Sequence, residues 1–196
     1  MQNTKYKVNE IFNSLQGEGV NLGKKVTFIR LAECNLKCEW CDTEYKKYEE
    51  MTIDEIVDKC NRNVIITGGE PTMQDLLPLL KILKLTKRWI GLETNGTNDI
   101  TELRSYLDYI AFSPKSKTHK SLIENADEIR IVNDNLTVEE VLKYENWKIE
   151  NRYISVLEKN GRYNLEETVK LIGKVNERSG HNWRIGQQYH KLLKIK

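Results

Sequence analysis

The sequence predicts an α/β fold in which a mostly parallel sheet forms a partial, open (β/α) barrel. Short runs of β-branched residues alternate with amphipathic segments of helical length, which is typical of βαβ units and a parallel sheet. Glycine-rich and polar motifs follow directly after the strands, where the active face of a barrel-like fold is expected. With 196 residues, the chain is too short for a full eight-fold barrel.

The first elements follow from local patterns. A β-branched run at residues 26–31 predicts a strand that leads straight into a cysteine-rich loop. Residues 52–61 are expected to be a helix, because Thr52 and Glu55 stand three positions apart as a capping box. Residues 64–67 are an apolar strand that ends at a Gly-Gly turn. The first three predicted elements are therefore a strand, a helix and a second strand.

The middle of the chain continues this alternation. Residues 75–85 are a leucine-rich helix whose start is marked by a preceding Pro-Thr. Residues 89–93 are a strand that ends at Thr-Asn-Gly, and residues 99–107 are predicted to be a helix. Residues 109–112 are a strand that ends at Ser-Pro-Lys.

The last part of the chain repeats the pattern twice more. Residues 128–132 and 153–156 are rich in β-branched residues and predict strands, with a helix at residues 137–144 between them. Residues 165–178 predict a longer amphipathic helix, and residues 183–185 a short last strand. The predicted strands and helices therefore alternate along the whole chain.

Composition limits the possible functions. A chain of this length buries one substantial core, so residues 1–196 are expected to form a single domain. The 31 basic and 29 acidic residues give a net charge of +2, which does not favour nucleic-acid or anionic-membrane binding. No apolar run is long enough to cross a bilayer. Clustered thiols without a secretory signal suit a reducing compartment, so we expect a cytoplasmic protein.

Three of the four cysteines form the most informative motif. Cys34, Cys38 and Cys41 are spaced as CxxxCxxC, and three thiolates can hold a [4Fe–4S] cluster while leaving its fourth iron open to a ligand. A structural zinc site would need a fourth ligand, for which the chain offers three histidines. Zinc modules more often use two separated cysteine pairs. The remote Cys60 is expected to be a small buried apolar residue.

The segment Gly68-Gly69-Glu70-Pro71 follows a predicted strand. Its glycines let the backbone approach a ligand closely, and its carboxylate could hold an ammonium group. Together with the cysteine triplet, it resembles the radical S-adenosylmethionine (SAM) superfamily, whose fold is a TIM-like barrel. The resemblance implies that the three cysteines hold the cluster and that its open iron binds SAM. It implies SAM-binding roles for Trp40, Asp42, Gly69, Glu70, Thr94, Asn95, Ser113 and Lys115.

Four further motifs resemble the family of the 7-carboxy-7-deazaguanine synthases. They are Q-G-E-G at 16–19, C-x-x-x-C-x-W-C-D-T at 34–43, T-G-G-E-P at 67–71 and Q-x-H-K at 188–191. The resemblance implies conversion of 6-carboxy-5,6,7,8-tetrahydropterin to 7-carboxy-7-deazaguanine with loss of ammonia, in queuosine or 7-deazapurine biosynthesis. It implies substrate contacts from Leu15, Gln16, Gly17, Glu18, Arg30, Thr67, Gln188, His190 and Lys196.

The residue types suit these roles. Arg30 can form a bidentate, charge-assisted pair with a substrate carboxylate, and Gln16 and Glu18 can hydrogen-bond to a pterin edge. The resemblance also implies a Mg²⁺ ion at Thr43, an electron donor such as flavodoxin or ferredoxin, and a homodimer. One departure is Glu33, which stands before the first cysteine where the family often has glycine.

Two other functions stay open from the sequence. A glycyl-radical-enzyme activase has the same cysteine spacing but acts on a protein glycine, and it would not need the Q-G-E-G or Asp42-Thr43 motifs. A zinc-stabilised binding module would have no redox role at all. Labile sulfide and pterin turnover would separate these three functions.

Overall fold

The fold is built on a nine-stranded sheet in a computed structural model that describes residues 4–41, 44, 46–159 and 161–196. The strands of this sheet are β1 (Lys5–Leu15), β2 (Lys25–Leu31), β3 (Glu49–Thr52), β4 (Asn63–Gly68), β5 (Trp89–Thr94), β6 (Tyr109–Phe112), β7 (Glu128–Val132), β8 (Asn151–Ser155) and β11 (Trp183–Gly186). A separate two-stranded ribbon consists of β9 (Glu158–Lys159) and β10 (Arg162–Tyr163).

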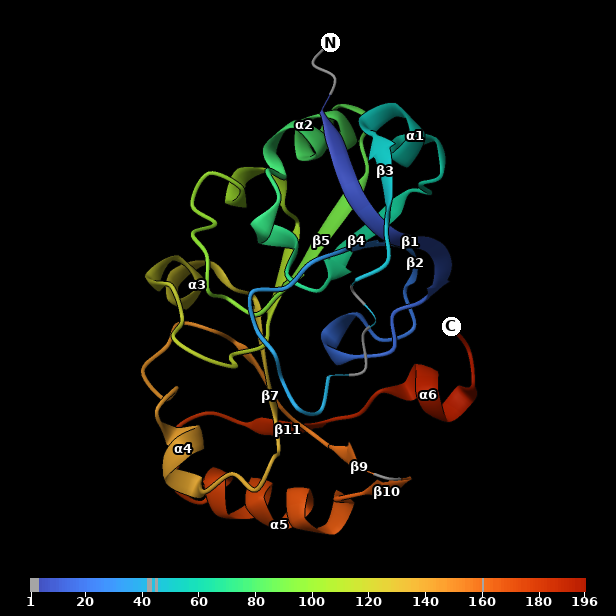
Figure 1. The fold of residues 1–196 in the computed structure, drawn as a ribbon. Helices are drawn as coiled ribbons and strands as arrows, with labels where there is room; N and C mark the ends of the chain where they lie inside the picture. The colour runs from blue at the N-terminus through green and yellow to red at the C-terminus, as the bar shows by residue number, and fades with distance from the viewer. Residues whose placement is uncertain (1–3, 42–43, 45, 160) are drawn as a thin grey trace.

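The strand order is β11-β8-β7-β6-β5-β4-β2-β1-β3. The strands from β2 through β4, β5, β6, β7 and β8 to β11 run parallel, whereas β1 is antiparallel to both β2 and β3. In the described part of the chain, β3 and β11 end the sheet without pairing with each other. The predicted open barrel with a mostly parallel sheet is therefore confirmed (Figure 1).

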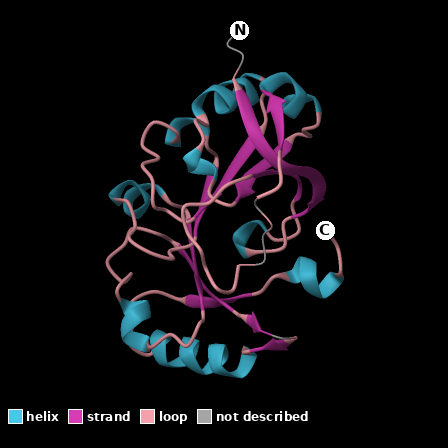
Figure 2. Ribbon diagram, in the orientation of Figure 1, coloured by secondary structure: helices cyan, strands magenta, loops and turns pink. Residues whose placement is uncertain are grey.

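The helices α1 to α5 lie around the outside of the curved sheet, whereas α6 stands apart from them near the C-terminus (Figure 2). The α-helices are α1 (Ile53–Asp58), α2 (Leu77–Leu85), α3 (Lys120–Asn125), α4 (Val138–Leu142), α5 (Leu165–Asn176) and α6 (Tyr189–Leu193). The 3₁₀ helices are η1 (Gly19–Asn21), η2 (Pro71–Met73) and η3 (Arg104–Tyr106). Among the described residues, no helix is long and apolar enough to cross a membrane.

Most predicted elements are present. Each of the seven predicted strands has a counterpart, and the predicted capping box is present, with Thr52 accepting from the Glu55 main-chain N–H. The helix predicted at 99–107 was wrong, because this stretch holds only turns and η3. There the Asp99 carboxylate accepts from both the main-chain N–H and the hydroxyl of Thr101, and such local bonds compete with helix formation. The sequence did not predict the strands β1, β3, β9 and β10 or the helices α3 and α6.

The two faces of the sheet differ in character. On the outer face, alternate strand residues such as Ile66, Leu92 and Ile129 join one apolar core with the helices. On the inner face, the intervening positions carry polar residues such as Thr67 and Glu93. Because side chains alternate along a strand, each strand packs against the helices through one set and lines a cavity through the other.

Cys60 lies just beyond the end of α1. Its side chain is buried, and its Sγ donates to the Ile56 carbonyl oxygen at 3.1 Å. Burial raises the pKa of the Cys60 thiol to about 11. The prediction of a small buried apolar residue is confirmed.

Candidate active site

A cavity of about 580 Å³ opens at the carboxyl ends of the parallel strands. Fourteen of the residues predicted to bind SAM or substrate line it: Leu15, Gln16, Glu18, Arg30, Trp40, Thr67, Gly69, Thr94, Asn95, Ser113, Lys115, Gln188, His190 and Lys196. Gly17 and Glu70 are not part of its lining. Asp42 and Thr43 lie outside the described residues. The structure thus gathers motifs from both ends of the chain around one cavity.

The three cysteines of the triplet lie on the loop that follows β2. Cys34 and Cys38 are half-buried and Cys41 is exposed. Burial raises the pKa of the Cys38 thiol; the nearby Lys115 opposes this shift, and Cys41 and Cys34 add to it. The thiols are therefore close enough to influence one another electrostatically. In the described part of the chain, no group of three His, Cys, Asp or Glu side chains is placed to hold a metal ion as it stands.

An all-sulfur donor set on one short loop fits an iron–sulfur cluster, since thiolates are the usual ligands of such clusters. Trp40 lies between the second and third cysteines and lines the cavity, with the Lys115 Nζ 4.8 Å from its ring centroid. The cysteine loop therefore borders the cavity through the Trp40 ring, and this ring lies beside the Lys115 cation of the segment that follows β6.

The Gly-Gly turn after β4 is packed against the cysteine loop. A Cβ at Gly69 would lie 1.9 Å from the Glu33 carbonyl oxygen and 3.0 Å from the Cys34 Cβ, so only glycine fits there. The Glu70 main-chain N–H donates to the same Glu33 oxygen at 2.8 Å. Glu33 itself has a φ of 71°, in the left-handed region that favours glycine. This explains why glycine at that position would suit the loop.

The Glu70 carboxylate is fully buried and connects the segment after β4 to the end of β5 through hydrogen bonds. It accepts hydrogen bonds from the Thr94 hydroxyl at 2.8 Å and the Asn95 main-chain N–H at 2.6 Å, on the loop after β5. It also accepts from the main-chain N–H and hydroxyl of Thr72. In this structure Glu70 therefore lies behind the cavity wall and fixes the end of β5 at Thr94 and the loops that carry Gly69 and Asn95.

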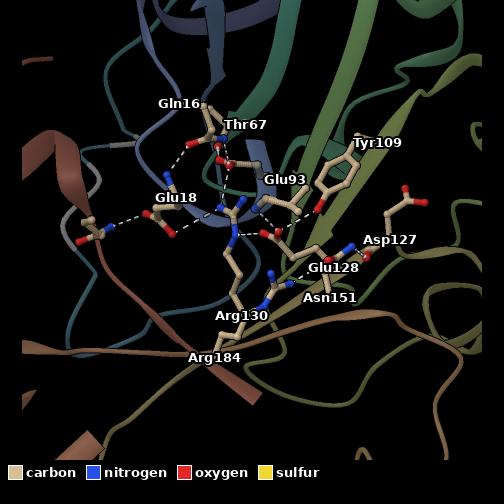
Figure 3. A network of polar contacts seen from close by, with 12 residues as sticks. Gln16, Glu18, Thr67, Glu93, Tyr109, Asp127, Glu128, Arg130, Asn151 and Arg184 are labelled. Atoms are coloured by element: carbon tan, nitrogen blue, oxygen red, sulfur yellow. Dashed lines mark hydrogen bonds and ion pairs between the residues drawn. The ribbon is translucent and has the colours of Figure 1, made fainter. Parts of the chain in front are cut away.

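A network of charged residues, in which Arg130 and Glu128 are buried, forms one end of the cavity. Figure 3 shows its polar contacts. The guanidinium of Arg130, on β7, donates through Nη1 to Glu93 at 2.9 Å and Glu18 at 3.4 Å. Its Nε donates to Glu128, whose side chain is completely buried. The Tyr109 hydroxyl donates to the other Glu128 oxygen at 2.7 Å. Three carboxylates thus face one guanidinium, and this end of the cavity has an excess of negative charge.

Glu93, on β5, occupies the centre of this network. Its two oxygens accept from the Gln16 side-chain amide at 2.9 Å and the Thr67 hydroxyl at 3.0 Å. Burial alone would raise the pKa of Glu93, but the charge of Arg130 and these hydrogen bonds outweigh it and lower the pKa. Burial alone would lower the pKa of Arg130, but the three carboxylates raise it. Both groups are therefore held in their charged forms.

The opposite end of the cavity carries positive charge. The Arg30 Nε donates to Glu10 at 2.9 Å, and the Lys196 Nζ lies 2.5 Å from the other Glu10 oxygen. Here two cations face one carboxylate. Arg30 is aligned with Thr67 on the neighbouring strand, and Thr67 bonds to Glu93 on the next one. At about 4.8 Å per strand, the main chains of β2 and β5, which carry Arg30 and Glu93, are about 10 Å apart.

The C-terminal segment closes the wall beside the Q-G-E-G motif. The Tyr189 main-chain N–H donates to the Gly17 carbonyl oxygen at 3.0 Å, and the Gln188 amide donates to Glu18 at 2.8 Å. A Cβ at Gly17 would lie 2.3 Å from the His190 Nδ1, so glycine permits this close packing. Figure 1 shows α6 beside the N-terminal hairpin.

The polar residues of this cavity and its supporting network that were not predicted include Glu10, Glu93, Glu128 and Arg130. A signal was present for two of them, because Glu128 and Arg130 alternate with isoleucines in β7. Such alternation of charge and apolar residues in a strand indicates that one face is not packed in an apolar core. Glu93 was predicted to lie at the end of a strand, and no motif among its sequence neighbours indicated that it lines a cavity.

Comparison with known proteins adds independent findings. Residues 29–185 match the radical SAM superfamily. The chain is 40% identical to 7-carboxy-7-deazaguanine synthase of Haemophilus influenzae, over 97% of this chain and 94% of that protein. It is 41% identical to the 7-carboxy-7-deazaguanine synthase of Neisseria meningitidis, over 99% and 96%. The crystal structure of QueE from Escherichia coli superposes with a TM-score of 0.70 at 24% identity, covering 94% of each chain.

Proposed function

Because this chain belongs to the radical SAM superfamily and, within it, to the 7-carboxy-7-deazaguanine synthases, we propose that it converts 6-carboxy-5,6,7,8-tetrahydropterin to 7-carboxy-7-deazaguanine. The reaction contracts the pterin ring with loss of ammonia and serves 7-deazapurine biosynthesis. The sequence motifs carried this hypothesis, and the family membership supports it along almost the whole chain.

The observation that carries the choice of substrate is the polarity of the cavity. Its Arg30 end has two cations facing one carboxylate, and its Glu93 end has three carboxylates facing one guanidinium. A molecule with a carboxylate at one end and an N–H-rich pyrimidine edge at the other complements both. The substrate's carboxylate then lies against Arg30, and its amino-pyrimidine edge lies against Glu93 and Glu18.

Each end of the cavity would hold the substrate through fixed groups. Arg30 offers a planar guanidinium to the carboxylate. The Glu93 and Glu18 carboxylates accept hydrogen bonds from the pyrimidine edge, and Arg130 fixes both acceptors. The protein thereby positions one ring carbon relative to the reacting group, since orientation alone can account for a large part of a rate enhancement.

The cofactors are a [4Fe–4S] cluster on Cys34, Cys38 and Cys41, and SAM. Bound together and reduced, they supply hydrogen-atom abstraction. Trp40, Gly69, Thr94, Asn95, Ser113 and Lys115 are proposed as SAM contacts, and their shared place in the cavity lining supports this. Asp42 is proposed as a further SAM contact and Thr43 as a Mg²⁺ ligand; both residues lie outside the described part of the chain.

The proposal includes external partners. A low-potential flavodoxin or ferredoxin would reduce the cluster. The protein is proposed to work in the cytoplasm as a homodimer. It is not proposed to bind nucleic acid or membranes. Exposed leucines on α6, Leu192 and Leu193, offer apolar surface to a second copy. Light scattering on a size-exclusion column tests the dimer, and a mass of 23.0 kDa would show a monomer.

Turnover of the pterin by the reconstituted protein tests the function. We expect anaerobic protein with iron, sulfide, SAM and a reductant to form 7-carboxy-7-deazaguanine, detected by mass spectrometry. Cys38→Ala is the control that removes a cluster ligand. SAM cleavage without pterin turnover would favour the glycyl-radical activase, and a colourless zinc protein without labile sulfide would favour the binding module.

A further inference from the structure

Glu10 occupies a position in the cavity that no sequence motif assigned. It lies on β1, and its carboxylate bridges two cations: Oε1 accepts from the Arg30 Nε at 2.9 Å, and Oε2 lies 2.5 Å from the Lys196 Nζ. The side chains of Glu10 and Arg30 are 29% and 25% exposed, and both line the cavity. Glu10 therefore touches the group that is proposed to hold the substrate's carboxylate.

An irregularity in β1 places Glu10 there. Val8 is aligned with Leu31 on β2, but Glu10 is aligned with Arg30, so Asn9 is an extra residue in the strand. A shift of one residue exchanges the two faces of a strand. Val8 accordingly packs in the core with the helices, whereas Glu10, two residues later, faces the cavity. In a regular ladder Glu10 would follow Val8 toward the helix layer.

The contact with Glu10 leaves one edge of Arg30 available. Among the described residues, the Nη groups of Arg30 make no hydrogen bond or ion pair, and the Arg30 Cζ lies 5.7 Å from the centroid of the Phe12 ring. Phe12 is itself stacked on Phe28 at 5.1 Å. Because Nε is occupied, a carboxylate can bind bidentately only through the Nη1–Nη2 edge.

Glu10 also sets the charge at this end of the cavity. The side chains of Arg30 and Lys196 supply two positive charges and that of Glu10 one negative charge, so these three side chains together carry one positive charge. Partial burial works against ionisation of Glu10, but hydrogen bonds from Lys196 and Arg30 outweigh it and lower its pKa. Glu10 is therefore an anion under the conditions in which the substrate would bind.

We propose that Glu10 is a positioning residue, which holds Arg30 so that the substrate's carboxylate binds end-on and its ring lies in one orientation. This inference rests on the proposed function. Without Glu10, Arg30 keeps its charge but can also bind a carboxylate side-on, through Nε and Nη2. Binding then survives, whereas the alignment of the ring for hydrogen abstraction is lost.

The test compares substrate affinity with the yield of productive turnover. Glu10→Ala removes both acceptor oxygens, and Glu10→Asp keeps the charge on a shorter side chain. Glu50→Ala is the matched control, because Glu50 pairs with Lys5 at 3.3 Å on the outer edge of the same sheet and is 55% exposed. Each reconstituted, SAM-loaded variant is titrated with the unreactive 6-carboxypterin and assayed for SAM cleaved per product formed.

For Glu10→Ala we expect the dissociation constant of 6-carboxypterin to stay within about threefold of wild type. Product formation should fall by about ten- to a hundredfold, and more SAM should be cleaved per product, because small misplacements carry costs of this size. Glu10→Asp should recover part of the coupling, and Glu50→Ala should behave as wild type.

Three results would overturn the inference. Wild-type turnover and coupling in Glu10→Ala would show that Arg30 needs no partner for its orientation. A loss of 6-carboxypterin affinity of more than about tenfold would assign Glu10 to binding and not to orientation. Faster turnover in Glu10→Ala would mean that Glu10 obstructs the substrate. Absence of product from the wild-type enzyme would be a separate result, which overturns the proposed function and this inference with it.

Discussion

Replacement of Arg130 by methionine tests whether the charged network at the Glu93 end is held together by one guanidinium. Arg130 is 7% exposed and contacts Glu93, Glu18 and the fully buried Glu128. Methionine has a similar length and no charge, so the variant removes the cation with little loss of packing. The three carboxylates are then left without their common partner.

The magnitude follows from the distances. Across 2.9 Å and with an effective dielectric constant of about 20, the attraction between Arg130 and Glu93 is about 6 kcal/mol. The desolvation of both groups offsets part of this attraction, and breaking a buried pair typically costs about 3–5 kcal/mol. We expect Arg130→Met to lower the free energy of unfolding by that amount at neutral pH.

Urea unfolding of the cluster-free protein measures this loss, with Glu128→Gln as the second arm of a double-mutant cycle. Because the loss arises from a buried carboxylate without a partner, adding Glu128→Gln to Arg130→Met should restore part of the stability. A loss below about 1 kcal/mol for Arg130→Met, or strictly additive effects in the double variant, would refute this account of the network.

The pH dependence gives a second, independent check on the same variant. The pKa of Glu93 is below its ordinary value of 4.5, in part because of Arg130. A lowered pKa stabilises the folded state above 4.5, and this contribution is lost as the pH falls below that value. Since Arg130→Met removes a cause of the shift, the stability difference from wild type should narrow as the pH falls through 4.5. A stability difference between wild type and Arg130→Met that widens as the pH falls through 4.5 would contradict the role of Arg130 in lowering the pKa of Glu93.

Four further predictions concern other parts of the molecule. Cys38→Ala should reduce iron and labile sulfide after reconstitution to near zero, and retention of a full cluster would remove Cys38 from the ligand set. Gly69→Ala should also lower iron incorporation, although it removes no ligand, because its Cβ would lie 1.9 Å from a main-chain oxygen of the cysteine loop. Arg30→Ala should raise KM for the pterin by about 10- to 150-fold, the loss of about 1.5–3 kcal/mol for a charge-assisted bond; an unchanged KM would exclude Arg30 from the site. Thr52→Ala should cost about 1 kcal/mol in chemical denaturation through loss of the α1 capping box, with activity unchanged.

The strand pattern could be predicted because it depends on local sequence. Runs such as Val64 to Thr67 are β-branched, end at glycine and are buried, so propensity and burial agree. The helix at 99–107 failed for a local reason as well. A helix was predicted there, but the Asp99 carboxylate instead accepts from the main-chain N–H and the hydroxyl of Thr101 in a turn.

The candidate site could be predicted only in part. Its motif residues are recognisable in the sequence, and the cavity brings most of them together. Glu93 and Arg130 were missed because their pairing joins strands that are far apart in sequence. Glu10 was missed because β1 was not predicted, and because the direction of its side chain depends on an extra residue that alternation along a strand does not reveal.

Leaving the barrel open has a consequence for self-association. A closed barrel has no free strand edges, whereas this sheet ends at β3 and β11, whose main-chain groups could pair with another molecule. Both strands have four residues, and β3 carries the adjacent exposed residues Glu49 and Glu50. Two copies approaching edge to edge at β3 would bring like charges together, so this edge resists the strand-to-strand stacking that leads to aggregation.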